Sequence, residues 1–291
     1  MTESRNNAIL AVDGGGTRCR VACEVDGIVH CAETGAANVS SDFDGALTQI
    51  RAGMMEISRT VGIAVQQMVT WPAFVGLAGV TDNEIAGRLR DALGLACARI
   101  NDDRPAAVRG ALGARDGLIA HCGTGSFLAV QTNGAMRFAG GWGSVLGDEA
   151  SAQWVGRRAL SETLCTYDGT QAETALTQKL LADLQGPAGI VRFAGSATPA
   201  QFGALAPSVT SAAKNSDPVA RGILQDSADY IAGTARKLRW QPGQAVCLTG
   251  GIAAHYANYL PTEMQSVIRP SLGEPLTGAL ALAKEVRHEH Q

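Results

Sequence analysis

The chain has 291 residues, of which 24 are basic and 27 are acidic, and 46% are hydrophobic. This length supports one large domain, or two of ordinary size, with a substantial core. The balanced charge, with no run of either sign, argues against nucleic acid or a membrane surface as the main partner.

The first predicted elements are two strands that flank a run of three glycines. Residues 9–12 are apolar, and residues 18–25 place small or apolar side chains at every second position, as half-buried strands do. Asp26-Gly27 then predicts a tight hairpin turn into a third strand. Glycine is costly within a strand, so residues 14–16 are expected to form a loop whose N–H groups cradle a phosphate. A bulged hairpin without a ligand is the alternative.

A second glycine-rich hairpin repeats this pattern. Residues 118–131 again read as a strand, a Gly-Thr-Gly loop and a strand. Thr124 lies nine residues before Asn133-Gly134, just as Thr17 lies nine residues before the first turn. Two copies in matching register indicate a duplicated fold whose halves face a shared ligand.

The remaining elements alternate between strands and helices in an α/β manner. They follow from amphipathic periodicity, apolar runs and capping residues. In the first half of the chain we predict helix 43–61, strand 73–77, a helix opened by a capping box at Thr81 and Glu84 and ending near Leu93, strand 98–100 and a helix toward Leu112. Helices 148–164 and 171–185 follow, and Thr198-Pro199 and Asp217-Pro218 each open a further helix. The last predicted elements are strand 245–248, a helix after Thr249-Gly250-Gly251 and helix 276–286.

The seven cysteines are scattered and lie mostly within apolar runs. None has C-x-x-C or zinc-site spacing, so we expect buried thiols in a reducing compartment. The polar N-terminus predicts no signal peptide, and no apolar stretch approaches the roughly 18–20 residues of a membrane span. We therefore expect a cytoplasmic protein.

Three glycine motifs occur in the order and rough spacing of the sugar kinase, actin and heat-shock-protein ATPase fold: DGGGT at 13–17, GTGS at 123–126 and TGG at 249–251. Together with GGWGSVLGDEAS at 140–151, they make nearly the whole chain resemble the family of N-acetylglucosamine kinases, bacterial glucosamine kinases and benzoyl-CoA reductase activator ATPases (the BadF/BadG/BcrA/BcrD type). The resemblance implies a duplicated actin-like (ribonuclease H-like) α/β fold with a nucleotide cleft between two lobes. We place these lobes at residues 1–112 and 113–291, with the final helix packing back on the first lobe.

The resemblance also implies an ATP site. Its nucleotide-binding residues would be Gly14, Gly15, Gly16, Thr17, Gly123, Thr124, Gly125, Gly250 and Gly251. Asp13 would orient Mg²⁺, through water because this ion keeps much of its hydration shell. Many members of the wider fold carry an acid in the second loop, whereas here His121 and Cys122 precede Gly123. Metal binding is therefore expected to depend more on Asp13, and His121 is interpreted as a strand residue packed beside the loop.

The substrate site follows from the same resemblance. Asp102 matches the aspartate that accepts the proton of the attacking sugar hydroxyl, and its neighbour Asp103 is the alternative base. The non-catalytic alternative is that these two acids only cap the helix toward Leu112. The substrate-binding residues would be Asn38, Asp102, Ser126, Phe127, Gly141, Trp142, Gly143 and Asp148. Glycines let backbone donors reach sugar hydroxyls, Trp142 offers a flat apolar wall, and Asp148, at the start of a helix, would accept two hydroxyl hydrogens.

These expectations describe a kinase that uses ATP and Mg²⁺ to phosphorylate N-acetylglucosamine or glucosamine at the 6-hydroxyl, in amino-sugar catabolism or cell-wall sugar salvage. We expect a homodimer that acts on a small-molecule sugar, without a nucleic-acid or membrane partner. One alternative is an activator-type ATPase with an iron–sulfur cluster, for which the cysteine set looks absent. The other is a non-catalytic ATP sensor, which the retention of Asp13, Thr17 and Asp102 disfavours.

Overall fold

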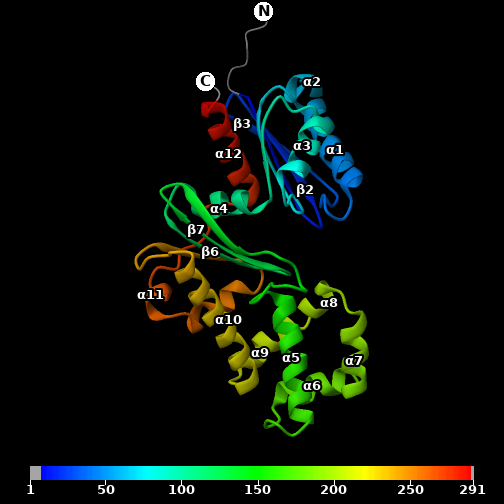
Figure 1. Ribbon diagram of the computed structural model, residues 1–291, viewed down its shortest axis with the longest axis vertical. Coiled ribbons are helices and arrows are strands. Elements are labelled where there is room, and N and C mark those ends of the chain that lie inside the picture. The colour runs from blue at the N-terminus through cyan, green and yellow to red at the C-terminus, as the bar shows by residue number, and fades with distance from the viewer. Residues whose placement is uncertain (1–7, 290–291) are drawn as a thin grey trace, which may run out of the picture. The chain divides into compact units, whose positions relative to one another are not determined.

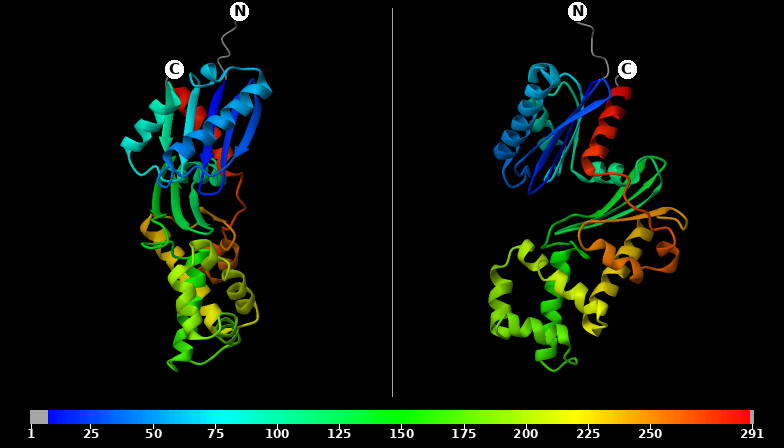
Figure 2. Two further views of the ribbon diagram at one scale, coloured as in Figure 1. Left: turned by 90° about the vertical axis from the view of Figure 1, so that its right-hand side faces the viewer. Right: turned by 180° about the vertical axis from the view of Figure 1, so that it is seen from behind.

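The structure is a computed structural model that describes residues 8–289. The chain divides into two compact units: unit 1 runs up to Ala114 and resumes at Leu272, and unit 2 is Arg115–Ser271. Each unit contains one β-sheet with helices packed on it (Figures 1 and 2).

The sheet of unit 1 has the strand order β3-β2-β1-β4-β5. Its strands are β1 (Ile9–Gly14), β2 (Cys19–Val25), β3 (Ile28–Thr34), β4 (Pro72–Leu77) and β5 (Cys97–Asn101). The first three form an antiparallel meander, while β4 runs parallel to β1 and β5 parallel to β4. The carboxyl ends of β1, β4 and β5 therefore meet at one edge of the sheet, where ligands commonly bind in α/β proteins.

Helices cover both faces of this sheet (Figure 1). They are α1 (Phe43–Val61), α2 (Val65–Met68), α3 (Asn83–Leu93), α4 (Arg104–Leu112) and α12 (Pro275–Glu289). The helix α1 buries the apolar stripe that contains Leu47, Ile50 and Met54 against one face. The other face packs against α4 and α12 through a second cluster that includes Phe74 and Ala279. The C-terminal helix is thus part of the core of unit 1.

Unit 2 contains the sheet β8-β7-β6-β9. Its elements are β6 (Gly117–Cys122), β7 (Ser126–Thr132), β8 (Ala135–Gly140), α5 (Ala152–Tyr167), α6 (Ala175–Asp183), α7 (Pro187–Ser196), α8 (Pro199–Gly203), α9 (Ala206–Lys214), α10 (Pro218–Lys237), β9 (Ala245–Thr249), the 3₁₀-helix η1 (Ala253–Tyr259) and α11 (Thr262–Gln265). A large cluster of buried residues joins the sheet to α5, α10 and η1. Among residues 8–289, no helix combines the length and the apolar character that crossing a membrane requires.

The predicted duplication is confirmed by the two sheets. In each, an antiparallel three-strand meander is followed by a strand parallel to the first strand of that meander. The turn residues Asp26 and Gly27 have φ of 52° and 79°, and Asn133 and Gly134 have φ of 49° and 78°. Positive φ at both central residues is the signature of the tight hairpin turns that the sequence predicts.

Two predictions about helices are wrong. The capping box is absent, because Asp82 is the N-cap of α3 and its side chain accepts from the Ile85 N–H at 2.9 Å. The helix expected from residue 148 begins only at Ala152. The helix predicted after the TGG turn is present and is a 3₁₀-helix. The sequence analysis also missed α7, which follows the left-handed Gly186.

Candidate active site

The first glycine loop joins β1 to β2, and its glycines have different surroundings. A Cβ added at Gly14 would lie 2.4 Å from Leu77 Cδ2, so packing requires glycine here. A Cβ at Gly15 would meet only the Arg18 carbonyl oxygen, at 4.0 Å, and one at Gly16 would face open space. The Gly15 N–H donates to that same carbonyl at 2.9 Å, so it is not one of the free donors that the sequence suggests.

Asp13, the expected metal-binding residue, is paired with Arg20 on the next strand. Arg20 donates from Nη2 at 2.6 Å and from Nε at 3.2 Å, both to Asp13 Oδ2. The guanidinium also pairs with Glu274. Burial alone would lower the pKa of Arg20, but its hydrogen bonds and charge interactions with the two carboxylates raise it. Because both Arg20 donors use Oδ2, Asp13 keeps Oδ1 for a further ligand.

The loop after β3 places Asn38 at the same edge of unit 1. The Ala37 N–H donates to the Gly15 carbonyl at 2.9 Å, which holds this loop against the first glycine loop. Asn38 Oδ1 accepts from Ser40 N at 3.0 Å and from Ser40 Oγ at 2.8 Å. The amide oxygen therefore shapes its own turn, and the amide NH₂ group is the part that a ligand would meet.

The loop after β5 carries two acidic residues at this edge. Arg104 binds the Asp102 carboxylate: its N–H (3.0 Å) and Nε (2.7 Å) donate to Oδ1, and its Nη2 (3.2 Å) donates to Oδ2. A carboxylate offers about four acceptor sites, so one further donor can be accommodated. Arg104 is the first residue of α4, so the same carboxylate also caps that helix. Burial, followed by the charges of Asp102 and Asp13, raises the pKa of Asp103 to about 6.

In unit 2 the TGG turn is packed against the start of the GTG loop. Gly250 has φ of +88°, and a Cβ there would lie 2.3 Å from the Cys122 carbonyl oxygen. The Ile252 N–H donates to this oxygen at 3.2 Å. Gly250 is therefore required for a close approach of two backbones, and Gly250, Gly251 and Thr124 are all exposed.

His121 lies where the two turns meet. Its Nδ1 is 3.1 Å from Thr249 Oγ1, and its ring stacks on Phe127 with centroids 5.3 Å apart. Burial lowers the pKa of His121, which keeps the ring neutral near pH 7. The position is that of a strand residue packed beside the loop, as the sequence analysis interprets it.

The segment after β8 has an unusual backbone. Gly140, Gly141 and Gly143 have φ of 78°, 79° and 85°, values that favour glycine. The Gly141 N–H donates to the Ser126 carbonyl at 2.9 Å, which ties the segment to the end of the GTG loop. Trp142, between these glycines, is 69% exposed. A large aromatic side chain in solvent is unusual and is available to a ligand.

Asp148 lies beside the GTG loop but not at the start of a helix. Ser151 is the N-cap of α5, and Asp148 instead has φ of 64°. Its carboxylate is buried, and Oδ1 accepts from Ser126 N at 3.2 Å. Burial raises the pKa of Asp148. A Cβ at Gly125 would lie 3.0 Å from Oδ2, so this oxygen borders the loop expected to bind phosphates.

Ser126 and Phe127 belong to the buried part of the hairpin. Ser126 is 5% exposed and donates from Oγ to the Glu149 carbonyl at 2.6 Å. Phe127 is 9% exposed and contacts His121 through its ring. Their role as sugar-contacting residues stays a prediction, because their side chains are already engaged within the protein.

A pocket of about 540 Å³ lies beside η1, the helix that leaves the TGG turn. It is lined by residues of α9, α10 and η1: Thr210, Ala213, Lys214, Arg221, Leu224, Ala254, His255, Asn258 and Tyr259. Burial, followed by the charge of Lys214, lowers the pKa of His255. Polar and charged side chains make up most of the lining, so the pocket offers many hydrogen-bond donors and acceptors to a ligand.

A family model describing the BadF/BadG/BcrA/BcrD ATPase family matches residues 10–283. The chain belongs to this family. It is 26% identical to the glucosamine kinase GspK of Vibrio cholerae over 287 residues, which is 97% of each chain. The solved structure of the Putative N-acetylglucosamine Kinase from Chromobacterium violaceum is 31% identical, with a TM-score of 0.78, and the match covers 95% of this chain and 98% of that one.

A more distant family of kinases has the same fold. A ROK family glucokinase from Streptomyces griseus, solved with glucose and AMPPNP, is 16% identical with a TM-score of 0.54 over 97% of this chain and all of that one. The predicted actin-like α/β class is therefore confirmed for this member of the BadF/BadG/BcrA/BcrD family.

Several residues of the site have no signal in the sequence analysis. Arg20 and Arg104 are not singled out there, yet they hold the Asp13 and Asp102 carboxylates. Alternation along β2 places Arg20 on the face opposite Cys19 and Val21, but it does not indicate the carboxylate that Arg20 would meet. The pocket beside η1 combines residues 210–224 with residues 254–259, about thirty residues further along the chain, so no local motif marks it.

Proposed function

We propose that this chain is an ATP-dependent kinase that phosphorylates an amino sugar, N-acetylglucosamine or glucosamine, at its 6-hydroxyl, in amino-sugar catabolism or cell-wall sugar salvage. The observation that carries the proposal is Asp102, a carboxylate held by Arg104 at the carboxyl ends of the parallel strands β1, β4 and β5, with room for one more donor. The family match and the names of the two similar proteins support the same chemistry.

ATP would be bound by elements of both glycine hairpins. Thr17 and Thr124 are exposed at the loop tips, where their hydroxyls would donate to phosphate oxygens. The open space over Gly15 and Gly16 leaves room for the phosphates. The pocket beside η1, directly after the TGG turn, would take the nucleoside.

Asp13 would bind Mg²⁺ together with the ATP phosphates. Within residues 8–289, no three His, Cys, Asp or Glu side chains group as a metal site. This arrangement fits Mg²⁺, which keeps several waters and takes one or two carboxylates plus substrate phosphates. When bound, the ion would neutralise charge that develops on the transferred group.

The sugar would be oriented by Asn38 and Asp102 in unit 1 and by the Trp142 and Asp148 segment in unit 2. In the transfer, Asp102 accepts the proton of the 6-hydroxyl while that oxygen bonds to the γ-phosphorus. The bond from this phosphorus to the β,γ-bridging oxygen breaks, and ADP leaves with the electron pair. The enzyme's contribution is mainly alignment and charge stabilisation.

The direct test is a coupled ADP-release assay over a panel of sugars, followed by phosphorus-coupled NMR of the product. We expect N-acetylglucosamine or glucosamine to be phosphorylated at the 6-position, and glucose to be a poorer substrate because it lacks the 2-amino or 2-acetamido group. A phosphate on the anomeric carbon, or no preference for amino sugars, would overturn the proposal.

Gly15→Val is expected to weaken ATP binding by about tenfold or more while barely changing the melting temperature. An added Cβ meets only Arg18 O, at 4.0 Å, so we expect the protein to tolerate the change, while the side chain fills the space proposed for phosphate. Isothermal titration calorimetry with a non-hydrolysable ATP analogue measures the effect. Gly87→Val, on α3 with nothing within 4 Å, is the control. An unchanged Kd in Gly15→Val would remove this loop from the nucleotide site.

Asp148→Asn is expected to raise the KM for the sugar by about tenfold and to lower kcat by much less. The proposed partners of Asp148 are hydroxyls that do not react, so losing the charge removes binding rather than transition-state stabilisation. Steady-state kinetics with the sugar varied at saturating ATP separates the two parameters. Glu162→Gln, on the far part of α5, is the matched control; equal losses in kcat and kcat/KM for Asp148→Asn would contradict a binding role.

A further inference from the structure

The segment 148–150 holds two non-glycine residues in left-handed backbone. Asp148 has φ of 64° and Ala150 has φ of 66°. A Cβ makes this conformation unfavourable, so a residue with a side chain adopts it only where the surroundings enforce it. Asp148 is the residue of this segment proposed above to bind the sugar, so its orientation depends on whatever enforces the backbone.

Besides the adjacent Ser151, whose N–H donates to the Asp148 carbonyl at 3.1 Å, residues distant in sequence hold the segment by hydrogen bonds. Ser126 donates from Oγ to the Glu149 carbonyl at 2.6 Å and from its N–H to Asp148 Oδ1 at 3.2 Å. Tyr256 donates from its hydroxyl to the Ala150 carbonyl at 2.6 Å. Ser126 thus holds the first two residues of the segment, and Tyr256 holds the third, which is itself left-handed.

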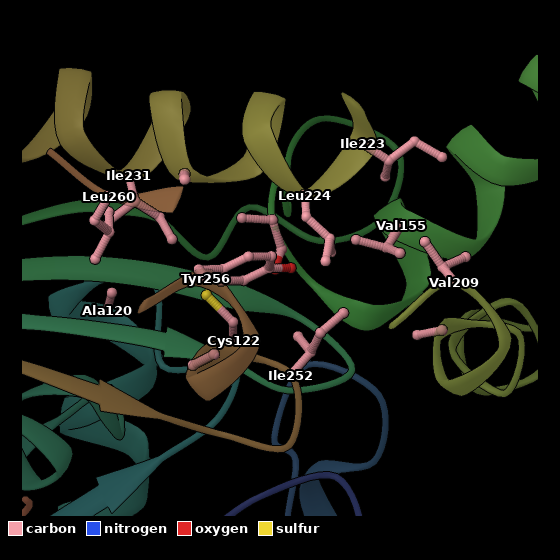
Figure 3. Packing of buried hydrophobic residues seen from close by; sticks show 14 of the residues in the cluster. Ala120, Cys122, Val155, Val209, Ile223, Leu224, Ile231, Ile252, Tyr256 and Leu260 are labelled. Atoms are coloured by element: carbon pink, nitrogen blue, oxygen red, sulfur yellow. The ribbon is translucent and has the colours of Figure 1, made fainter. Parts of the chain in front are cut away.

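Tyr256 is rigidly placed. It stands on η1, and its ring is fully buried in the core of unit 2, near Cys122, Leu224 and Ile252 (Figure 3). Its oxygen points toward the side of the cluster where Val155 of α5 lies (Figure 3). Burial raises the pKa of Tyr256, so the hydroxyl keeps its proton and acts as a donor.

We propose that Tyr256 is a positioning residue for the sugar site: its hydroxyl, through the Ala150 carbonyl, holds segment 148–150 in the left-handed form that presents Asp148. The part that concerns sugar binding rests on the proposed function. The neighbouring η1 residues His255 and Asn258 line the pocket beside η1, so one short helix supports the proposed sugar segment and the proposed nucleoside pocket.

The first experiment is Tyr256→Phe, which keeps the ring in the core and removes only the hydroxyl. We expect the sugar KM to rise about fivefold, the size of one net hydrogen bond, with the KM for ATP within about twofold. Thr163→Val is the matched control. Thr163 is fully buried on α5 of the same unit and donates from its hydroxyl to the Ala159 carbonyl at 2.8 Å. This control is expected to lower the melting temperature without changing the sugar KM.

The double variant Tyr256→Phe/Ala150→Gly separates positioning from lost stability. Glycine adopts positive φ without the Cβ penalty, so position 150 depends less on the tyrosine hydroxyl to keep its conformation, while Asp148 stays left-handed. We expect part of the fivefold rise in sugar KM to be recovered. A sugar KM that rises in Tyr256→Phe and is not recovered by Ala150→Gly would overturn the proposed route through the left-handed backbone.

Hydrogen exchange on the ligand-free protein tests the same idea without catalysis. The Ser151 N–H donates to the Asp148 carbonyl at 3.1 Å and the Ala152 N–H to the Gly123 carbonyl at 2.8 Å, so both report on the segment. We expect faster exchange of these amides in Tyr256→Phe, partial recovery in the double variant and no change in Thr163→Val. If the wild type phosphorylates no amino sugar, the proposed function fails while exchange still decides the role of Tyr256. Unchanged exchange together with an unchanged sugar KM would overturn the inference.

Discussion

Asp102→Asn is expected to lower kcat by about a hundred- to ten-thousandfold, the usual cost of losing a general base. The amide fills the same space and its oxygen can still accept from Arg104, so the Kd values for the ATP analogue and the sugar should stay within a few-fold. What the amide lacks is the ability to take up the proton of the attacking hydroxyl. Coupled ADP release gives kcat, and calorimetry gives the two Kd values.

Asp103→Asn is the matched control because it changes the adjacent carboxyl group. Its pKa is raised from 3.8 to about 6, so the folded protein binds this proton more tightly than the unfolded chain. The free energy of unfolding therefore falls as pH rises from about 4 to about 6 and stays lowered above that. We expect Asp103→Asn to melt at a similar temperature to the wild type near pH 4 and at a higher temperature at pH 7.

The activities of the two variants decide between the two carboxylates. Kinase activity within a few-fold of the wild type in Asp103→Asn, with a steep loss in Asp102→Asn, would support Asp102 as the base. The reverse pattern would identify Asp103 as the residue that accepts the proton. Equal rates for Asp102→Asn and the wild type would exclude Asp102 as the base.

The fold was predictable from the sequence where local rules act alone. Asp26-Gly27 and Asn133-Gly134 sit in turns that need positive φ at both central residues, and the structure shows it. The stripe at 43–61 is buried as one helix face because its period matches the α-helix. In these segments the residue propensities, the spacing of apolar residues and the turn residues all favour the same local structure. Tertiary contacts therefore do not change the conformation that the local sequence predicts.

The errors occur where the backbone is held by distant contacts. Asp148 reads as a helix start, but Ser126 binds its carboxylate from another strand, and Ala150 is left-handed although alanine favours helices. Gly250 also has a structural role that the sequence does not mark, because a Cβ there would lie 2.3 Å from the Cys122 carbonyl oxygen; its contact with the nucleotide stays a prediction. No local pattern can distinguish a glycine needed by a ligand from one needed by the fold.

The same limit applies to charge pairs. Arg20 and Asp13 are seven residues apart on opposite strands of a hairpin, so the register places Arg20 directly opposite Asp13. Glu274 comes from the C-terminal segment that returns to unit 1, and sequence separation hides that partner. The sequence therefore indicates Asp13 as a candidate metal-binding residue, but it does not predict that the Arg20 guanidinium binds the same carboxylate.

Asp13→Asn is expected to lower kcat by on the order of a hundredfold or more. The change removes the negative charge proposed to bind Mg²⁺ and leaves Arg20 with only Glu274 as a carboxylate partner. Because Arg20 uses Oδ2, an asparagine placed with its oxygen toward Arg20 keeps that hydrogen bond and turns its NH₂ group toward the ion. We therefore expect the loss to appear mainly in metal binding rather than in folding.

A Mg²⁺ titration at fixed ATP and saturating sugar tests this directly. In Asp13→Asn the Mg²⁺ concentration for half-maximal rate should rise, while the Kd for the ATP analogue measured without Mg²⁺ should change little. Glu33→Gln is the control, because it neutralises an acid of the same sheet whose pair with Arg18, at 3.6 Å, is exposed. Exposed pairs contribute little, so this variant should match the wild type in both measurements. Wild-type turnover in Asp13→Asn, or a loss of melting temperature large enough to account for the lower rate, would exclude Asp13 as the metal residue.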